Sequence, residues 1–294
     1  MAAPTVEDVT ADGLAGTLIR PSADRPPAAL LIAGSGPTDR DGRSRSLAAP
    51  YLKNLADGLA ARGIASLRYD KRGVARSAAA GPSEQNLRFD HYVADAARWA
   101  AWLHGRGDLG PVALAGHSEG ALIATRASLR TPTGPLILLA PPGRPFGAVL
   151  RDQLRETPMP PALLDEALAT LGALERGEAT PSVSPPLFAL FRPSVQPYLL
   201  SMIAVDPARE LSAIRGRVLI VSGGRDLQIT ANDIAALVRA RPDAEHYHRA
   251  TMNHVLADAP EDREGNVLLY ADPTTALAPG LVDAVTAFIA RGPS

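Results

Sequence analysis

An apolar run at residues 112–115 leads directly into Gly-His-Ser-Glu-Gly at 116–120, and helix-forming residues follow. This pattern constrains the fold because a buried strand must turn sharply into a helix around one serine. The turn imposes strained backbone angles on Ser118, and the small residues Gly116 and Gly120 let the strand and the helix approach each other. We therefore predict a strand–turn–helix unit that exposes the Ser118 hydroxyl, with an ordinary strand–helix turn as the alternative.

Short apolar segments alternate with longer amphipathic segments in the first half of the chain. In a helix expected at 50–62, Leu52, Leu55 and Leu59 recur at helical spacing, and Gly63 ends the helix. A second helix is expected at 89–103, and strands are expected at 14–20, 28–33, 64–69, 112–115 and 136–140. Because these strands are separated by helices and lack alternation, we predict a mainly parallel sheet with helices on both faces.

The pattern changes after residue 140. From 141 to about 212 prolines are frequent, no convincing strand occurs, and apolar residues recur at helical spacing. The pattern then resumes with an expected strand at 217–221, a helix at 231–240, a strand at 244–248 and a helix at 280–290. We interpret residues 1–140 and 213–294 as one α/β core, and residues 141–212 as a helical insertion over the carboxyl edge of the sheet.

Composition narrows the class of protein. The 294 residues are enough for one large α/β domain with an insertion, or for two small domains. The formal net charge of −1 gives no global field that attracts nucleic acid or an anionic membrane. The absence of cysteine excludes disulfides, thiolate metal sites and a cysteine nucleophile. Because no segment has the apolar length of a membrane span and the N-terminus has no signal-peptide pattern, we expect a cytoplasmic location.

Two residues later in the chain can activate the Ser118 hydroxyl, which is a weak nucleophile without a base and an orienting acid. Asp226 directly follows the strong strand at 217–221, and His254 lies in a loop after the last expected strand. Reacting groups gather at the carboxyl ends of parallel strands. We therefore predict that Asp226 orients His254 and that His254 activates Ser118, with an ordinary turn aspartate as the alternative for Asp226.

The other histidines fit the role of the base less well. His117 lies inside the sharp turn and cannot reach around it to the serine hydroxyl. His91 and His104 precede Ser118 and belong to a helix and its end. His246 and His248 alternate along the last strand, where a structural or exposed position is expected.

Attack on an acyl carbon also requires hydrogen-bond donors for the oxyanion that forms, each worth about 3 kcal/mol in comparable sites. One donor is expected to be the backbone N–H of Glu119. The other is expected from the loop after the strand at 28–33, with the N–H of Ser35 preferred and that of Gly36 second. Phosphate binding at 34–36 is a weaker alternative, because no Gly-Lys-Thr/Ser sequence follows these glycines.

Two charged segments follow strands near this loop. One is Asp-Arg-Asp-Gly at 39–42, and the other is the Asp-x-Arg-Gly-x-x-x-Ser spacing at 70–77. Opposite charges on these segments can pair with one another and hold both loops beside the site. We therefore predict a structural role for these charges rather than a part in the chemistry.

Together these motifs resemble the α/β-hydrolase superfamily over nearly the whole chain, and the nucleophile–acid–base order is the one found there. The segments 34–42, 198–202 and 252–256 are similar to bacterial carboxylesterases of the lysophospholipase-like and serine-aminopeptidase-like subgroup. The resemblance implies an α/β-hydrolase fold with an eight-stranded, mainly parallel sheet, and a helical lid at 141–212 between the sixth and seventh strands. Ala33 departs from the family, where a histidine is common, but the oxyanion donor is a backbone group and is not removed.

The expected activity is that of a cofactor-free serine hydrolase that cleaves small-molecule carboxylic esters with short to medium acyl groups. In this reading Ser118 is acylated, His254 transfers the proton, and no metal, nucleic acid or integral membrane segment takes part. The oligomeric state is left open. The candidate substrate-binding residues are Gly36 and a set of apolar residues for which packing of the lid is an equal alternative: Phe146, Leu187, Phe188, Phe191, Tyr198 and Met202.

Other functions remain as alternatives, because a fold alone does not fix the chemistry. The same three residues can cleave a thioester or an amide bond. A binding protein that keeps a hydrolase fold without activity is a weaker alternative, since all three positions are filled. A cofactor-free haloperoxidase or a lyase is weaker still.

Overall fold

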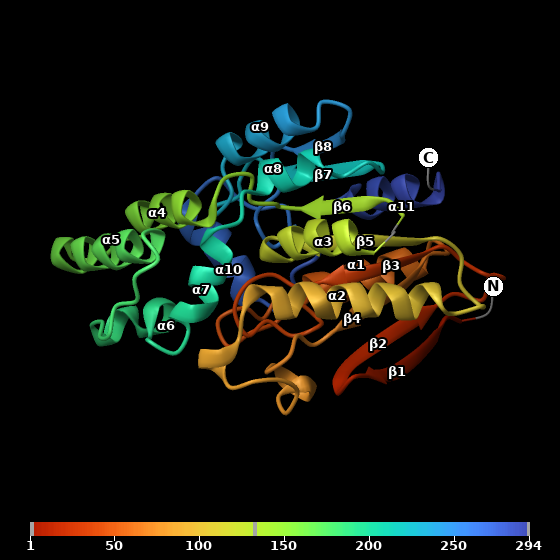
Figure 1. The fold of residues 1–294 in the computed structure, drawn as a ribbon. Helices are drawn as coiled ribbons and strands as arrows, with labels where there is room; N and C mark the ends of the chain where they lie inside the picture. Colours follow the sequence, from red (N-terminus) through yellow and green to blue (C-terminus); the bar gives the residue numbers. More distant parts are fainter. Residues whose placement is uncertain (1–2, 132–133, 293–294) are drawn as a thin grey trace.

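The computed structural model describes residues 3–131 and 134–292, which form one central sheet with helices around it (Figure 1). The strands, in chain order, are β1 (Thr5–Ala11), β2 (Leu14–Arg20), β3 (Ala28–Ile32), β4 (Ala65–Tyr69), β5 (Val112–His117), β6 (Leu136–Leu139), β7 (Val218–Gly223) and β8 (Glu245–Arg249). Their order across the sheet is β1-β2-β4-β3-β5-β6-β7-β8. β2 is antiparallel to β1 and β4, and all neighbours from β4 to β8 are parallel.

Two hydrophobic clusters lie on the two faces of the sheet. In β3, Leu30 belongs to one cluster and Leu31 to the other, and both side chains are fully buried. Adjacent strand residues point to opposite faces, so a strand covered on both sides must be apolar throughout. One face packs against α1 (Tyr51–Ala60) and α11 (Leu281–Ala290), and the other against α2 (Phe89–His104), α3 (Glu119–Arg130) and α9 (Ala231–Ala240).

The segment between β6 and β7 is helical. Its elements are α4 (Phe146–Glu156), α5 (Pro161–Glu175), a 3-10 turn at Pro185–Leu187, α6 (Phe188–Phe191), α7 (Gln196–Ile203) and α8 (Pro207–Ser212). Helices α4 to α7 extend beyond the end of the sheet toward which the β6 arrow points (Figure 1). This is the edge at which the carboxyl ends of the parallel strands meet, so residues from these helices lie near the loops that follow the strands.

One strand and one α-helix outside the segment between β6 and β7 were not expected from the sequence. β1 forms a hairpin with β2 through polar residues, and Val9 is its only buried side chain. The helix α10 (Arg263–Ala271) leaves Val267 and Leu268 exposed and buries the polar Asn266 instead. Neither element has the apolar periodicity by which buried elements are recognised. Within the described residues, no helix combines the length and the apolar character needed to cross a membrane.

Candidate active site

The turn after β5 places Ser118 in an unusual backbone conformation. Its φ is 53° and its ψ is −122°, and its N–H donates to the carbonyl oxygen of Leu139 on β6 at 2.9 Å. A Cβ atom on Gly116 would lie 2.0 Å from the carbonyl oxygen of Gly120, and one on Gly120 would lie 2.4 Å from that of Ile32. Both positions therefore require glycine, and a positive φ at a serine costs on the order of 1–3 kcal/mol that the surrounding structure must offset.

Asp226 and His254 come together at the same edge of the sheet. The Nδ1 atom of His254 lies 2.9 Å from Oδ2 and 3.1 Å from Oδ1 of Asp226, and both side chains are almost completely buried. Oδ1 of Asp226 also accepts the backbone N–H groups of Gln228 at 2.8 Å and Ile229 at 2.9 Å. Because an ionised carboxylate only accepts hydrogen bonds, Nδ1 carries the proton in the neutral imidazole, and Nε2 is left as the acceptor.

The loops that carry Asp226 and His254 are tied together by two buried asparagines. Oδ1 of Asn253 accepts the N–H groups of Val255 and Ala257, each at 3.1 Å. Its amide nitrogen donates to Oδ1 of Asn266 at 3.0 Å, and the Asn266 amide donates to the carbonyl oxygen of Arg225 at 2.8 Å. Asn266 lies on α10, so the helix that sequence analysis missed connects the two loops. No motif in the sequence signals this connection.

The loop that carries His254 contacts the side chain of His117, the residue before Ser118. The Nε2 atom of His117 lies 2.7 Å from the carbonyl oxygen of His254, and the two imidazole rings are 4.7 Å apart between centroids. Among the described residues, no hydrogen bond joins the Ser118 hydroxyl to His254 itself. Such bonds are often long in ligand-free enzymes and shorten when the substrate binds.

The loop predicted to supply an oxyanion donor lies beside Ser118. A Cβ atom on Gly34 would be 3.3 Å from the Cβ atom of Ser118. Ser35 and Gly36 are exposed, and Gly36 has a φ of 71° that favours glycine. Glu119 is the first residue of α3, where backbone N–H groups have no partner within the helix. In residues 3–131 and 134–292, the N–H groups of Ser35 and Glu119 make no backbone hydrogen bond, so both can serve a ligand.

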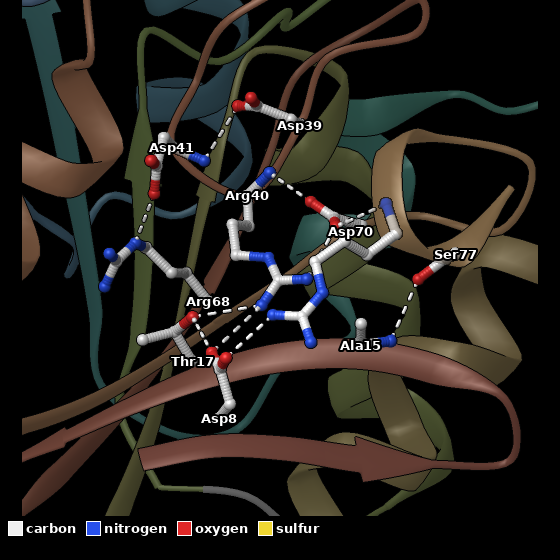
Figure 2. A network of polar contacts seen from close by, with 10 residues as sticks. Asp8, Ala15, Thr17, Asp39, Arg40, Asp41, Arg68, Asp70 and Ser77 are labelled. Carbon is white, nitrogen blue, oxygen red and sulfur yellow. Dashed lines mark hydrogen bonds and ion pairs between the residues drawn. The ribbon is translucent and has the colours of Figure 1, made fainter. Parts of the chain in front are cut away.

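The charged segments behind this loop form one of the expected cross-pairs, Arg40 with Asp70, and strand β4 adds a second pair, Arg68 with Asp41 (Figure 2). The guanidinium of Arg40 lies 2.6 Å from Oδ2 of Asp70, and that of Arg68 lies 2.7 Å from Oδ1 of Asp41. Asp70 also accepts the backbone N–H groups of Arg40 at 2.9 Å and Arg76 at 3.1 Å. One buried carboxylate therefore fixes the backbone of both segments, which supports a structural role.

The predicted substrate-binding residues of the helical segment differ in exposure. Phe188 is 47% exposed, whereas Phe191 is fully buried, and Tyr198 and Met202 are also buried in the hydrophobic cluster. Burial raises the pKa of the Tyr198 hydroxyl well above its ordinary value, and the nearby carboxylate of Glu119 adds to the effect. The Tyr198 ring on α7 packs edge-on against the ring of Tyr92, with 5.5 Å between the centroids. Leu187 is buried and Phe146 half-buried.

Comparison with known proteins gives one family and one curated relative. Residues 48–168 match the family described as serine aminopeptidase, S33. This range contains Ser118 but neither Asp226 nor His254. The chain is 31% identical to Esterase EstD of Thermotoga maritima over 233 residues, which are 77% of this chain and 53% of EstD. The chain therefore spans about half the length of this relative.

Solved structures of esterases and a thioesterase share the fold. Est1E of Butyrivibrio proteoclasticus, solved with bound ferulic acid, has a TM-score of 0.61 at 14% identity, covering 97% of this chain and 96% of Est1E. The Pyrococcus furiosus esterase Pf2001 also has a TM-score of 0.61, at 15% identity, and the match covers 98% of this chain and 90% of Pf2001. The thioesterase domain from the curacin biosynthetic pathway has a TM-score of 0.58 at 16% identity, and the match covers 99% of this chain and 100% of that domain.

Proposed function

This chain belongs to the α/β-hydrolase superfamily, and from that premise we propose that it is a serine hydrolase that cleaves carboxylic esters. The observation that carries the proposal is the buried pair of Asp226 and His254, joined at 2.9 Å beside the turn that presents Ser118. The relationship to EstD, which is named an esterase, supports ester hydrolysis over the alternatives.

In the proposed first step, Ser118 Oγ attacks the acyl carbon while Nε2 of His254 takes the hydroxyl proton. Asp226 holds Nδ1–H and stabilises the imidazolium that forms. The carbonyl electron pair moves onto oxygen, where the N–H groups of Ser35 and Glu119 stabilise the negative charge. When the tetrahedral intermediate collapses, the ester C–O bond breaks and His254 returns its proton to the leaving alcohol.

In the second step, water replaces the alcohol. His254 takes a proton from water as the hydroxide attacks the acyl carbon, and the same two N–H groups stabilise the second oxyanion. Collapse breaks the bond to Ser118 Oγ, which regains the proton from His254, and the carboxylic acid leaves. Atoms and charges balance without a cofactor or metal ion.

We propose that the helical segment at 141–212 forms a lid that selects the acyl group. Its placement at the carboxyl edge of the sheet and the packing of Tyr198 against Tyr92, whose ring lies 5.0 Å from Lys71 Nζ, support this role. Phe191 and Met202 are buried in the packing of the segment, and we propose that this packing limits the depth of the acyl pocket. We therefore propose esters with short to medium acyl groups as substrates, and the cytoplasm, predicted from the sequence, as the place of action.

Hydrolysis of p-nitrophenyl esters from acetate to palmitate tests the proposal. We expect turnover with an optimum at short to medium chains, and its loss in Ser118→Ala. Ser128→Ala is the matched control, because its hydroxyl only donates to the carbonyl oxygen of Ala124 within the same helix. Labelling of the wild type but not Ser118→Ala by a fluorophosphonate would identify the nucleophile. If the protein hydrolysed a matched thioester or anilide faster than the ester by orders of magnitude, thioester or amide hydrolysis would replace ester hydrolysis as the proposed activity.

A further inference from the structure

Lys71 is a completely buried lysine at the carboxyl end of β4. Its ammonium donates a 2.5 Å hydrogen bond to the carbonyl oxygen of Gly34. Its nearest carboxylate oxygen, Oε1 of Glu119, is 3.8 Å away, and the ring of Tyr92 lies 5.0 Å from Nζ. Charged groups are costly to bury unless they are paired and hydrogen-bonded. The strongest contact of this ammonium is thus with the backbone of the loop beside Ser118.

The carbonyl that Lys71 holds belongs to the same peptide unit as the Ser35 N–H. A peptide unit is planar, and in the trans form its C=O and N–H point in opposite directions. Fixing the Gly34 carbonyl toward Lys71 therefore directs the Ser35 N–H away from Lys71. A cation on the carbonyl oxygen also polarises the unit, which makes the N–H a stronger donor.

The same ammonium is linked to the residue that carries the second proposed donor. Glu119 begins α3, and its side chain is buried against Lys71 while its backbone N–H follows Ser118 directly. Within the described residues, Oε1 of Glu119 has no hydrogen-bond partner. The attraction between this carboxylate and Lys71 therefore connects the start of α3 to the loop at 34–36.

We propose that Lys71 is a positioning residue that holds the two backbone donors of the oxyanion hole, Ser35 N–H and Glu119 N–H, in the geometry that stabilises the transition state. This inference rests on the proposed esterase function. Lys71 itself does not touch the substrate.

A role in folding alone explains the arrangement less well. Burial lowers the pKa of Lys71, and Glu119 offsets this effect only in part. Replacing a buried ion pair by apolar side chains of similar size is often neutral or stabilising. Methionine at 71 together with glutamine at 119 would fill much the same volume without the cost of burying two charges, so stability alone gives no reason for an ammonium that is hydrogen-bonded to one loop carbonyl.

The test compares Lys71→Met with Lys53→Met. Lys53 is the other lysine of the chain and forms an exposed pair with Asp57, so its substitution is the matched control. For each variant we would measure kcat and KM for a p-nitrophenyl ester, and the inhibition constant of a trifluoromethyl ketone. Such a ketone adds Ser118 Oγ to its carbonyl carbon and places the resulting oxyanion in the hole. Circular dichroism at the assay temperature confirms that each variant is folded.

We expect kcat of Lys71→Met to fall by about 10- to 100-fold and the ketone to bind more weakly by a similar factor, with KM changed by less than about threefold. Lys71→Gln, which keeps a neutral donor, should recover part of this loss. A purely structural lysine would change stability without separating kcat from KM. If folded Lys71→Met keeps the wild-type kcat and ketone affinity, the inference is wrong.

Two further comparisons separate the role of Lys71 from the effect of an unpaired Glu119 and from a failure of the proposed function. Lys71→Met leaves the Glu119 carboxylate buried without a cation, so the double variant Lys71→Met/Glu119→Gln, which removes both charges, is measured in the same way. Absence of ester turnover in the wild type would instead overturn the proposed function. Turnover in the wild type with unchanged kcat in the lysine variants would overturn only the role of Lys71.

Discussion

The Nε2 atom of His117 donates to the carbonyl oxygen of His254 at 2.7 Å, so the residue before Ser118 holds the backbone of the proposed base. A carbonyl oxygen only accepts, so Nε2 carries the proton. The Nδ1 atom is buried and has no hydrogen-bond partner among the described residues. His117 therefore acts as a neutral donor, and burial holds its pKa well below the ordinary value, with His254 nearby adding to the effect.

A histidine that must stay neutral in the folded state makes the protein sensitive to acid. Below the ordinary pKa of about 6.5, the unfolded state binds a proton at His117 that the folded state does not, so the free energy of unfolding falls as pH falls. The contribution of this one group is at most about 1.4 kcal/mol per pH unit. We expect His117→Phe to be less stable at pH 8 but to lose less stability between pH 6.5 and 5, as measured by urea unfolding. Parallel pH dependences in the two proteins would contradict this account.

Asp226→Asn tests the tautomer of the proposed base. An asparagine amide can donate to Nδ1 of His254, which favours the proton on Nε2 and removes the acceptor that Ser118 needs. We expect kcat to fall by about 10⁴-fold, as in other triads of this kind, with little change in KM. Asp262→Asn is the control, because this exposed carboxylate also accepts a backbone N–H, from Gly265, and among the described residues it forms no hydrogen bond or ion pair with Ser118, Asp226 or His254. Equal activity of Asp226→Asn and the wild type would exclude Asp226 as the orienting acid.

Local patterns were enough to predict most of the fold. The strand at 28–33 is a fully buried apolar run, and the glycine pattern around Ser118 is required by contacts under 3 Å. Both features are read from neighbouring residues. Strand β1 was missed because a hairpin at the edge of the sheet is stabilised by backbone pairing with β2, which leaves no apolar signal.

The supporting contacts of the candidate site could not be predicted because they join distant segments. Asn253 and Asn266 are ordinary polar residues in the sequence, and only the packing of α10 brings them to 3.0 Å. Lysine is normally exposed, so nothing local indicates that Lys71 is buried beside Gly34. By contrast, the pairing of Arg40 with Asp70 was predictable, because opposite charges on two loops at one sheet edge attract each other over a range of geometries.

The Arg40–Asp70 pair should contribute strongly to stability. Both side chains are less than a tenth exposed, and removing one partner of a buried pair typically costs about 3–5 kcal/mol. We expect Asp70→Ala to lower the free energy of unfolding by this amount, because it also removes the acceptor of two backbone N–H groups. The exposed pair of Lys53 and Asp57 is the control, and Lys53→Ala should cost less than about 0.5 kcal/mol in the same urea titration. A small effect of Asp70→Ala would show that the loops are held by other contacts.

The start of the proposed lid is fastened to α9 through Asp233. Its buried carboxylate accepts the N–H groups of Gly143 and Arg144, each at 3.2 Å, and pairs with the Arg144 guanidinium at 2.9 Å. A Cβ atom on Gly143 would lie 1.8 Å from the carbonyl oxygen of Asp233, so the backbones are in direct contact. Burial raises the pKa of Asp233, but hydrogen bonds from Arg144 and Thr230 outweigh it, and the pKa lies below its ordinary value.

Arg144→Met should therefore destabilise the protein in a way that depends on pH. Without the guanidinium the buried carboxylate of Asp233 keeps its hydrogen bonds but loses its cationic partner, and we expect a loss of about 3 kcal/mol in the free energy of unfolding at pH 7. As pH falls, Asp233 in the variant takes up a proton before the wild type does, so the difference between the two proteins should shrink toward pH 4. Arg176→Met, which breaks an exposed pair with Glu178, should show neither the loss nor its pH dependence. A difference that is the same at pH 7 and pH 4 would mean that Arg144 stabilises the start of the lid by packing rather than by its charge.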